Sequence, residues 1–107
     1  MDSVMYIEKV EEELYQLKKK DQTIGTFKLI EFAGDIGKLE QLQVADHISP
    51  GRVLEVFEVI QSFVEEEGFA ELHVESHSQT LDFLLQHQQF KLDDVEKSLW
   101  IFTVNHK

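Results

Sequence analysis

One change of hydrophobic period in the middle of the chain restricts the fold more than any other feature. Between residues 53 and 64, apolar side chains recur three or four positions apart, as on one face of a helix. The flanking segments 38–44 and 70–75 carry strand-like patterns instead, that of 70–75 being strictly alternating. Two strands joined through a helix lie parallel in one sheet, with a right-handed connection. The sequence therefore predicts a β-α-β unit.

The segments before this unit are predicted to be strands of an antiparallel meander. They are rich in aromatic and β-branched residues and are separated by short polar or glycine-containing turns. The expected elements are a short edge strand at 4–7, strands at 13–20 and 25–32 joined by a turn at Asp21-Gln22, and a hairpin loop at 33–37.

The segments after the first helix continue the alternation of strands and helices. Gly68 is expected to end that helix. A second helix is predicted at 78–89, capped by Ser76 or Ser78, and a final strand at 98–104 follows a turn at Asp93-Asp94. The predicted class is α+β. A mixed sheet begins as an antiparallel meander and continues as β-α-β-α-β with two main helices, in one domain over residues 1–107.

Composition narrows the range of partners. The 107 residues include 21 acidic and 10 basic side chains, for a formal charge of −11. This charge disfavours nucleic acid and anionic membranes and favours cationic partners. There is no cysteine, which excludes disulfides and thiolate chemistry. Neither a signal-like N-terminus nor a long apolar run is present, so we expect a cytoplasmic protein.

Several stretches resemble the GNAT superfamily of N-acetyltransferases. "LEQLQV", a helix ending in "EEEGF", and "AELHVE" are similar to the fourth strand, third helix and fifth strand of that family, and "LDFLLQHQQF" is similar to its fourth helix. The likeness spans about residues 39 to 92, and the two helices that usually come earlier have no counterpart. It implies acetyl-CoA as a cofactor, lying between strands 38–44 and 70–75.

The resemblance also places a cofactor loop at the start of the first helix. The family pattern Gln/Arg-x-x-Gly-x-Gly/Ala falls on Ser49, Arg52 and Leu54, and none of them matches. Gly51 is one position away, and Pro50 has no N–H to offer a phosphate. The implied cofactor-binding residues are Val44, Ser49, Gly51, Arg52, Val53 and Ser78, the last at a position where the family often has asparagine.

Two interpretations of "SPGRVLEVF" remain open at this level. Arg52 and the backbone amides of the first turn would bind the pyrophosphate of CoA, because a helix N-terminus favours an anion. Alternatively, the segment is an ordinary helix start in which the Ser49 hydroxyl caps those amides and Pro50 is the first helical residue.

The catalytic groups implied by the resemblance are incomplete. The family's frequent tyrosine acid falls on Leu85, which has no proton to give. Glu40 and Glu75 are the candidate bases, and the alternative is that both are solvated surface carboxylates. His73, Glu75 and His77 alternate along one strand, but the pattern does not match a zinc-peptidase motif and we predict no metal. The three lysines of "LKKKD" (17–21) are interpreted as a solvated hairpin turn.

Two functions therefore stand side by side. The first is an acyl-CoA-dependent N-acetyltransferase acting on an amine or lysine-bearing acceptor. The second is a non-catalytic GNAT-fold module for binding or regulation, which kept the scaffold and lost the cofactor loop. Exposed apolar residues on the last strand or on helix 78–89 would favour the second, because a short domain often completes its core as a homodimer.

Overall fold

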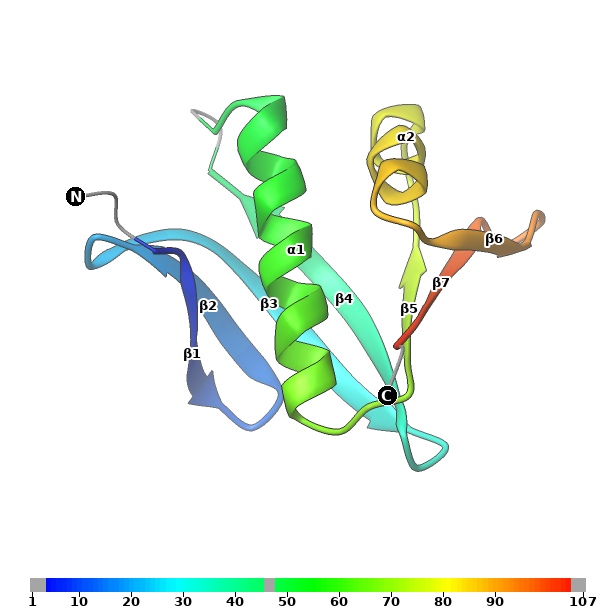
Figure 1. Ribbon diagram of the computed structural model, residues 1–107, viewed down its shortest axis with the longest axis horizontal. Coiled ribbons are helices and arrows are strands. Elements are labelled where there is room, and N and C mark those ends of the chain that lie inside the picture. Colours follow the sequence, from blue (N-terminus) through cyan, green and yellow to red (C-terminus); the bar gives the residue numbers. More distant parts are fainter. Residues whose placement is uncertain (1–3, 46–47, 105–107) are drawn as a thin grey trace.

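The computed structural model describes residues 4–45 and 48–104, and these form a seven-stranded sheet with two helices on one of its faces (Figure 1). The strands are β1 (Tyr6–Glu11), β2 (Leu14–Lys19), β3 (Gln22–Phe32), β4 (Ile36–Val44), β5 (Glu71–Glu75), β6 (Lys91–Asp94) and β7 (Leu99–Thr103). The helices are α1 (Pro50–Glu66) and α2 (Gln79–His87).

The sheet has the order β1-β2-β3-β4-β5-β7-β6. Strands β1 to β4 form an antiparallel meander, as predicted. β4 and β5 are parallel and are connected through α1, which confirms the β-α-β unit. β7 lies between β5 and β6 and is antiparallel to both, so the sheet is mixed.

The predicted turn at Asp93-Asp94 is wrong, because both residues belong to β6. The turn follows this strand, where Asp94 Oδ1 accepts hydrogen bonds from the backbone N–H groups of Glu96 at 3.0 Å and Lys97 at 3.2 Å. β6 escapes detection because it is a four-residue edge strand, mostly exposed, whose sequence KLDD lacks an alternating apolar pattern. β1 also differs from the prediction, since it begins at Tyr6 and runs on to Glu11.

Both helices end and begin near the expected residues. α1 is followed by Gly68, whose φ of 87° gives the left-handed conformation that glycine adopts readily after a helix. α2 is capped by Ser78, whose hydroxyl oxygen accepts a hydrogen bond from the N–H of Leu81 at 3.0 Å. None of the helices in the described ranges is long and apolar enough to cross a membrane.

The core lies between the helices and the sheet. Gln61 Nε2 donates to the carbonyl of Gln88 at 2.7 Å, which links α1 to the end of α2. Trp100 Nε1 donates to Asp82 Oδ1 at 3.0 Å, which links β7 to α2. The largest fully buried side chains are Phe27, Phe57, Leu17, Ile60, Leu72, Leu85, Val56 and Val64.

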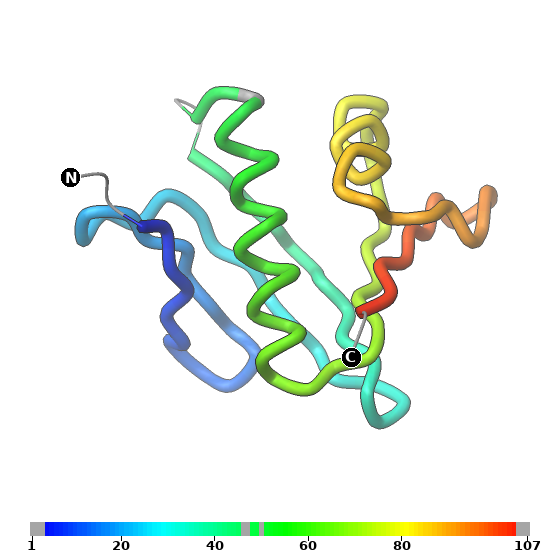
Figure 2. The backbone as a smooth tube through the Cα atoms, viewed as in Figure 1, coloured from blue at the N-terminus to red at the C-terminus, as the bar shows by residue number. Residues whose placement is uncertain are grey.

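No described helix covers the opposite face of the sheet. β1 and β2 are joined by Glu12 and Glu13 alone, and no described residue before α1 is helical, so the two earlier helices of the family have no counterpart in the described ranges (Figure 2). Hydrophobic and charged side chains share this face, and among them Lys38, Glu40 and His73 are half-buried. The candidate site residues lie near the carboxyl ends of β4 and β5, where the two helices begin.

Candidate functional site

β4 and β5 separate towards the ends at which α1 and α2 begin, as Figure 2 shows. Their pairing runs from Ile36 opposite Glu71 to Leu39 opposite Val74, and β4 then continues to Val44 paired with β3 only. A cleft of about 290 Å³ lies at this separation. In a sheet with parallel strands, the crevice beyond the carboxyl ends is a common place for a ligand to bind.

An irregularity in β4 accompanies the separation. Thr26 of β3 pairs with Gln43 and Lys28 pairs with Glu40, so two residues of β4 lie opposite one residue of β3. Gln41 within this bulge has a φ of 53°, which is uncommon for a residue with a side chain. A bulge bends its strand and increases the local twist, so it contributes to turning the end of β4 away from β5.

The two predicted bases line the same cleft. Glu40 comes from the part of β4 beyond its pairing with β5, and Glu75 is the last residue of β5. Lys38 Nζ lies 3.4 Å from Glu75 Oε1, whereas Glu40 has no ion pair within the part of the chain that the structure describes. His77 and Leu81 complete the wall beside α2.

The predicted cofactor-binding residues lie at the end of the sheet where the two helices begin. Val44 is the last residue of β4, Ser49 precedes α1, and Ser78 precedes α2. They gather there because each helix begins after the carboxyl end of a parallel strand. The Ser78 oxygen is used in capping α2, so its hydroxyl hydrogen is the group left to donate to a ligand.

Of the two open interpretations of this segment, the ordinary helix start is confirmed in its positions, with Ser49 as the N-cap residue and Pro50 as the first helical residue, but capping by the Ser49 hydroxyl is not. Its side chain makes no capping hydrogen bond among the described residues, and its carbonyl instead accepts the N–H groups of Arg52 at 2.9 Å and Val53 at 3.1 Å. The hydroxyl therefore does not occupy the first-turn amides, although the amides of Arg52 and Val53 are used by the backbone itself.

Gly51 and Arg52 present an open surface at this helix start. A Cβ added to Gly51 would meet no atom within 4 Å. Arg52 is exposed, and its Nη1 lies 3.0 Å from Glu55 Oε2. Because that ion pair is exposed, it is weak enough for the guanidinium to exchange Glu55 for another anion.

A cluster of cations lies beside this helix start, and the sequence interpretation missed it. Lys19 and Lys20 from the β2–β3 hairpin line one pocket of about 240 Å³ together with Arg52 and Ile48. The sequence pattern alone indicates only a solvated hairpin turn for these lysines. The predicted antiparallel meander could have indicated this cluster. The start of β3 lies beside the end of β4, and this arrangement brings the β2–β3 hairpin close to the start of α1.

Two other predicted positions have structural roles. Leu85, where the family often has tyrosine, is fully buried in the core. His73 Nε2 lies 2.8 Å from Glu71 Oε1, so it contacts a carboxylate on its own strand. No group of three or more histidine, aspartate or glutamate side chains is arranged to hold a metal ion in the described ranges.

Solved structures with the same fold are acetyltransferases. A GNAT family acetyltransferase from Elizabethkingia anophelis with acetyl-CoA bound is similar with a TM-score of 0.72 and 15% identity, over 85% of this chain and 75% of that one. The ribosomal-protein-S18-alanine N-acetyltransferase from Escherichia coli gives a TM-score of 0.70 and 13% identity, over 92% and 74%.

An IAA acetyltransferase from Bacillus cereus gives a TM-score of 0.64 and 19% identity, over 76% of this chain and 56% of that one, so the chain spans just over half of that protein. No protein-family model matches the sequence, and no curated protein does. The chain has the fold of the GNAT acetyltransferases, in a form with two helices among its described residues.

Proposed function

We propose that this protein transfers an acetyl group from acetyl-CoA to an amine. The observation that carries the proposal is the cleft between β4 and β5, which is lined by both Glu40 and Glu75 and lies beside the start of α2. The shared fold adds support, since a structural neighbour was solved with acetyl-CoA bound.

The donor set at the start of α1 fits a phosphorylated acyl carrier. In place of the glycine-rich loop, the chain offers the cations of Lys19, Lys20 and Arg52 around one pocket. Lysine and arginine side chains bind phosphate oxygens through charge-assisted hydrogen bonds. In a protein with a formal charge of −11, such a local cluster is what a polyanionic ligand requires. The open surface at Gly51 adds room for close approach.

Glu40 is the better of the two candidate bases. Glu75 is engaged by Lys38, whereas the Glu40 carboxylate lies in the same cleft without an ion pair in the described ranges. In the proposed reaction, the amine nitrogen bonds to the acetyl carbon while the carbon–sulfur bond breaks. Glu40 accepts the proton that the amine loses, and the thiolate that leaves takes up a proton.

His77 is a candidate for supplying that second proton, because it lines the cleft together with Glu40 and Glu75 and an imidazolium nitrogen can donate a proton. Leu85 has no such capacity and is buried in the core. The acceptor is proposed to carry a positive charge, as an amine or a lysine side chain, because the acidic surface attracts cations.

Calorimetric titration with acetyl-CoA at low salt tests the proposal, with pantetheine as a ligand that lacks the phosphates. Wild-type protein is expected to bind acetyl-CoA, and a Lys19→Glu/Lys20→Glu variant is expected to bind it at least about tenfold more weakly. A Lys91→Glu/Lys97→Glu variant is the matched control, since it makes the same charge change outside the pocket. Folded wild-type protein that gives no heat with millimolar acetyl-CoA would overturn the proposal.

Exposed apolar side chains are the observation on which the second candidate function, a module that binds another protein, would rest. Phe83 on α2 is 59% exposed, and Leu92 in β6 and Val95 in the following turn are 45% and 78% exposed. Burying such residues in an interface would be favourable. Sedimentation velocity of wild type and of Phe83→Ser/Val95→Ser distinguishes this function. A dimer that the double variant abolishes supports it, and a monomer that turns over acetyl-CoA contradicts it.

A further inference from the structure

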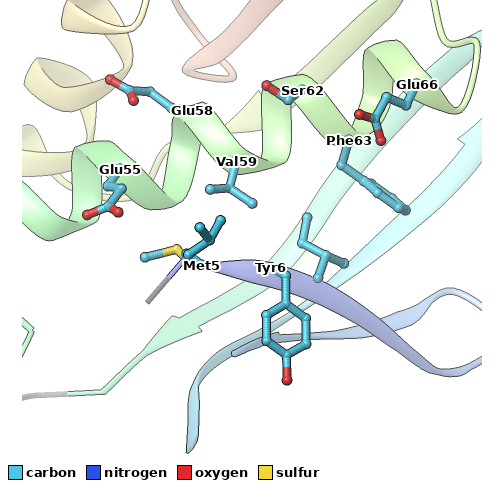
Figure 3. Close-up of a pocket in the computed structure, with 10 residues that line it drawn as sticks. Met5, Tyr6, Glu55, Glu58, Val59, Ser62, Phe63 and Glu66 are labelled. Atoms are coloured by element: carbon cyan, nitrogen blue, oxygen red, sulfur yellow. The ribbon is translucent and has the colours of Figure 1, made fainter. Parts of the chain in front are cut away.

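A second groove lies on the other side of α1 from the cleft, between this helix and the edge strand β1 (Figure 3). The groove has a volume of about 680 Å³ and is open to solvent. None of the candidate cofactor-binding or catalytic residues lines it. The groove is lined by Val4, Met5, Tyr6 and Ile7 from one side and by Glu55, Glu58, Val59, Ser62, Phe63 and Glu66 from the helix.

The floor of the groove is apolar. In Figure 3, Val59 and Phe63 project from the side of the helix that faces β1, and Met5 lies across the groove from the helix. Met5 is buried, while Val59 and Phe63 are half-buried and pack against the core. The floor therefore offers contact area to an aliphatic chain laid along it.

The rim of the groove is acidic. Glu55, Glu58 and Glu66 lie along it, and no lysine or arginine is among the lining residues. Neither Glu58 nor Glu66 has an ion pair in the described part of the chain, whereas Glu55 contacts Arg52. An apolar floor beneath carboxylates is complementary to lysine and arginine, whose aliphatic stems bury while their charged ends reach a polar rim.

The end of α1 adds a second reason to expect a cation there. Its last turn contains Glu65 and Glu66 and no basic residue, and Glu67 follows as the C-cap. Negative charge at the C-terminal end of a helix is unfavourable, because the helix dipole is negative at that end. A cationic partner beside Glu66 would relieve this repulsion.

β1 offers backbone groups along the same groove. It is the outer strand of the sheet that the described residues form, so along one of its edges the N–H and C=O groups pair with no other described strand. The second half of the strand is protected against further pairing by Lys9 and by an irregularity between Lys9 and Glu11. The first half has neither device. Its first residue, Tyr6, is 40% exposed, and Val4 just before the strand is 80% exposed.

We propose that this groove binds an extended, cationic segment of another protein, which pairs with β1 and directs lysine or arginine side chains towards Glu58 and Glu66. Side chains alternate between the two faces of an added strand, so every second residue would face the helix and the rim. A second copy of this chain is the poorer occupant, because two identical acidic rims repel each other. The proposal does not depend on acetyl transfer, since the groove and the β4–β5 cleft share no lining residue.

Peptide binding measured by fluorescence anisotropy tests the proposal on the full chain. The probe is a labelled heptapeptide in which lysine and threonine alternate, and two control peptides carry glutamate for lysine or a central proline that prevents strand pairing. The lysine peptide is expected to bind at low salt, and both control peptides are expected to bind at least about tenfold more weakly. Hydrogen exchange of the amides of residues 4–8 is expected to slow when the lysine peptide is bound.

The variant Glu58→Gln/Glu66→Gln separates binding from stability. It is expected to bind the lysine peptide about five- to tenfold more weakly, while its melting temperature stays the same or rises because the helix end carries less negative charge. Glu65→Gln/Glu96→Gln removes the same charge away from the groove and is expected to keep the wild-type affinity.

Three results would overturn the proposal. The first is equal affinity of both double variants for the lysine peptide, and the second is equal binding of the proline peptide. The third is a combination of two observations: wild-type protein does not bind the lysine peptide, and it forms a dimer that the Val4→Lys variant does not form. This combination would identify a second copy of the chain as the occupant.

Discussion

Lys38 Nζ lies 3.4 Å from Glu75 Oε1 and so joins β4 to β5 at the point where their pairing ends. The two side chains are 34% and 39% exposed, so the ion pair is expected to contribute less than about 1 kcal/mol to stability. The ion pair matters more for the proposed reaction, because it engages one of the two carboxylates in the cleft and leaves Glu40 as the proposed proton acceptor.

Replacing the two carboxylates one at a time is expected to separate their roles. Glu40→Gln should lower the rate of acetyl transfer about 100-fold, which is the usual contribution of a general base. Glu75→Gln should lower it by less than about tenfold. Release of free thiol at saturating acetyl-CoA measures both rates, and calorimetry checks that acetyl-CoA binding is unchanged. Equal losses in the two variants would contradict the assignment of the base to Glu40.

Much of the fold follows from the sequence, because the residues that build it carry strong local patterns. The apolar period predicts α1, and the strict alternation predicts β5. Gly68 predicts the end of α1, and the structure contains all three features. β6 could not be found in this way. Its four residues lie at the sheet edge, and only the hydrogen bonds to β7 make the segment a strand.

The site could be predicted only in part. The resemblance indicated Glu40 and Glu75, but not that Lys38 would engage one of them, since this depends on the register of β4 against β5. The role expected for the Ser49 hydroxyl failed because a residue of the right type at a helix start need not use its side chain. That Lys20 and Arg52 line one pocket could not be predicted from local patterns, because it depends on how the strands of the meander pack in three dimensions.

Leu85→Tyr is expected to destabilise the protein without creating a catalytic acid. Leu85 is fully buried, so the larger ring would overpack the core and lower the free energy of unfolding by about 1 to 3 kcal/mol. Urea unfolding measures this loss, and Leu85→Met, which conserves volume, should cost less than about 1.5 kcal/mol. A faster acetyl transfer in the tyrosine variant, at unchanged stability, would show that this position reaches the cleft after all.

Two glycines provide a matched pair of alanine substitutions with opposite effects. A Cβ on Gly25 in β3 would lie 2.7 Å from the backbone oxygen of Gln43, so Gly25→Ala should lower the free energy of unfolding by about 2 kcal/mol or more. A Cβ on Gly51 meets nothing within 4 Å, and Gly51→Ala should raise that free energy by up to about 1 kcal/mol, because alanine favours the helix.

Gly51→Ala also tests the start of α1 as a phosphate site. The variant should bind acetyl-CoA more weakly although it is more stable, because the added methyl group keeps phosphate oxygens away from the backbone. Thermal melting and calorimetry on the same preparation compare the two effects. Unchanged affinity in a stabilised variant would mean that the phosphates are held by Lys19, Lys20 and Arg52 alone.

The hydrogen bond from Trp100 Nε1 to Asp82 Oδ1 is expected to be a main link between α2 and the sheet. Trp100 is 8% exposed, so in Asp82→Ala the indole N–H would lose its partner in a largely buried place, at a cost of about 1 to 3 kcal/mol. Asp82→Asn keeps an oxygen acceptor and should cost less, although it loses the favourable negative charge in the first turn of α2. Trp100 is the only tryptophan, so its fluorescence reports urea unfolding of both variants directly. If α2 is held mainly by Leu84 and Leu85 in the core, the two variants will unfold at the same urea concentration as wild type, and the hydrogen bond will have no measurable role in stability.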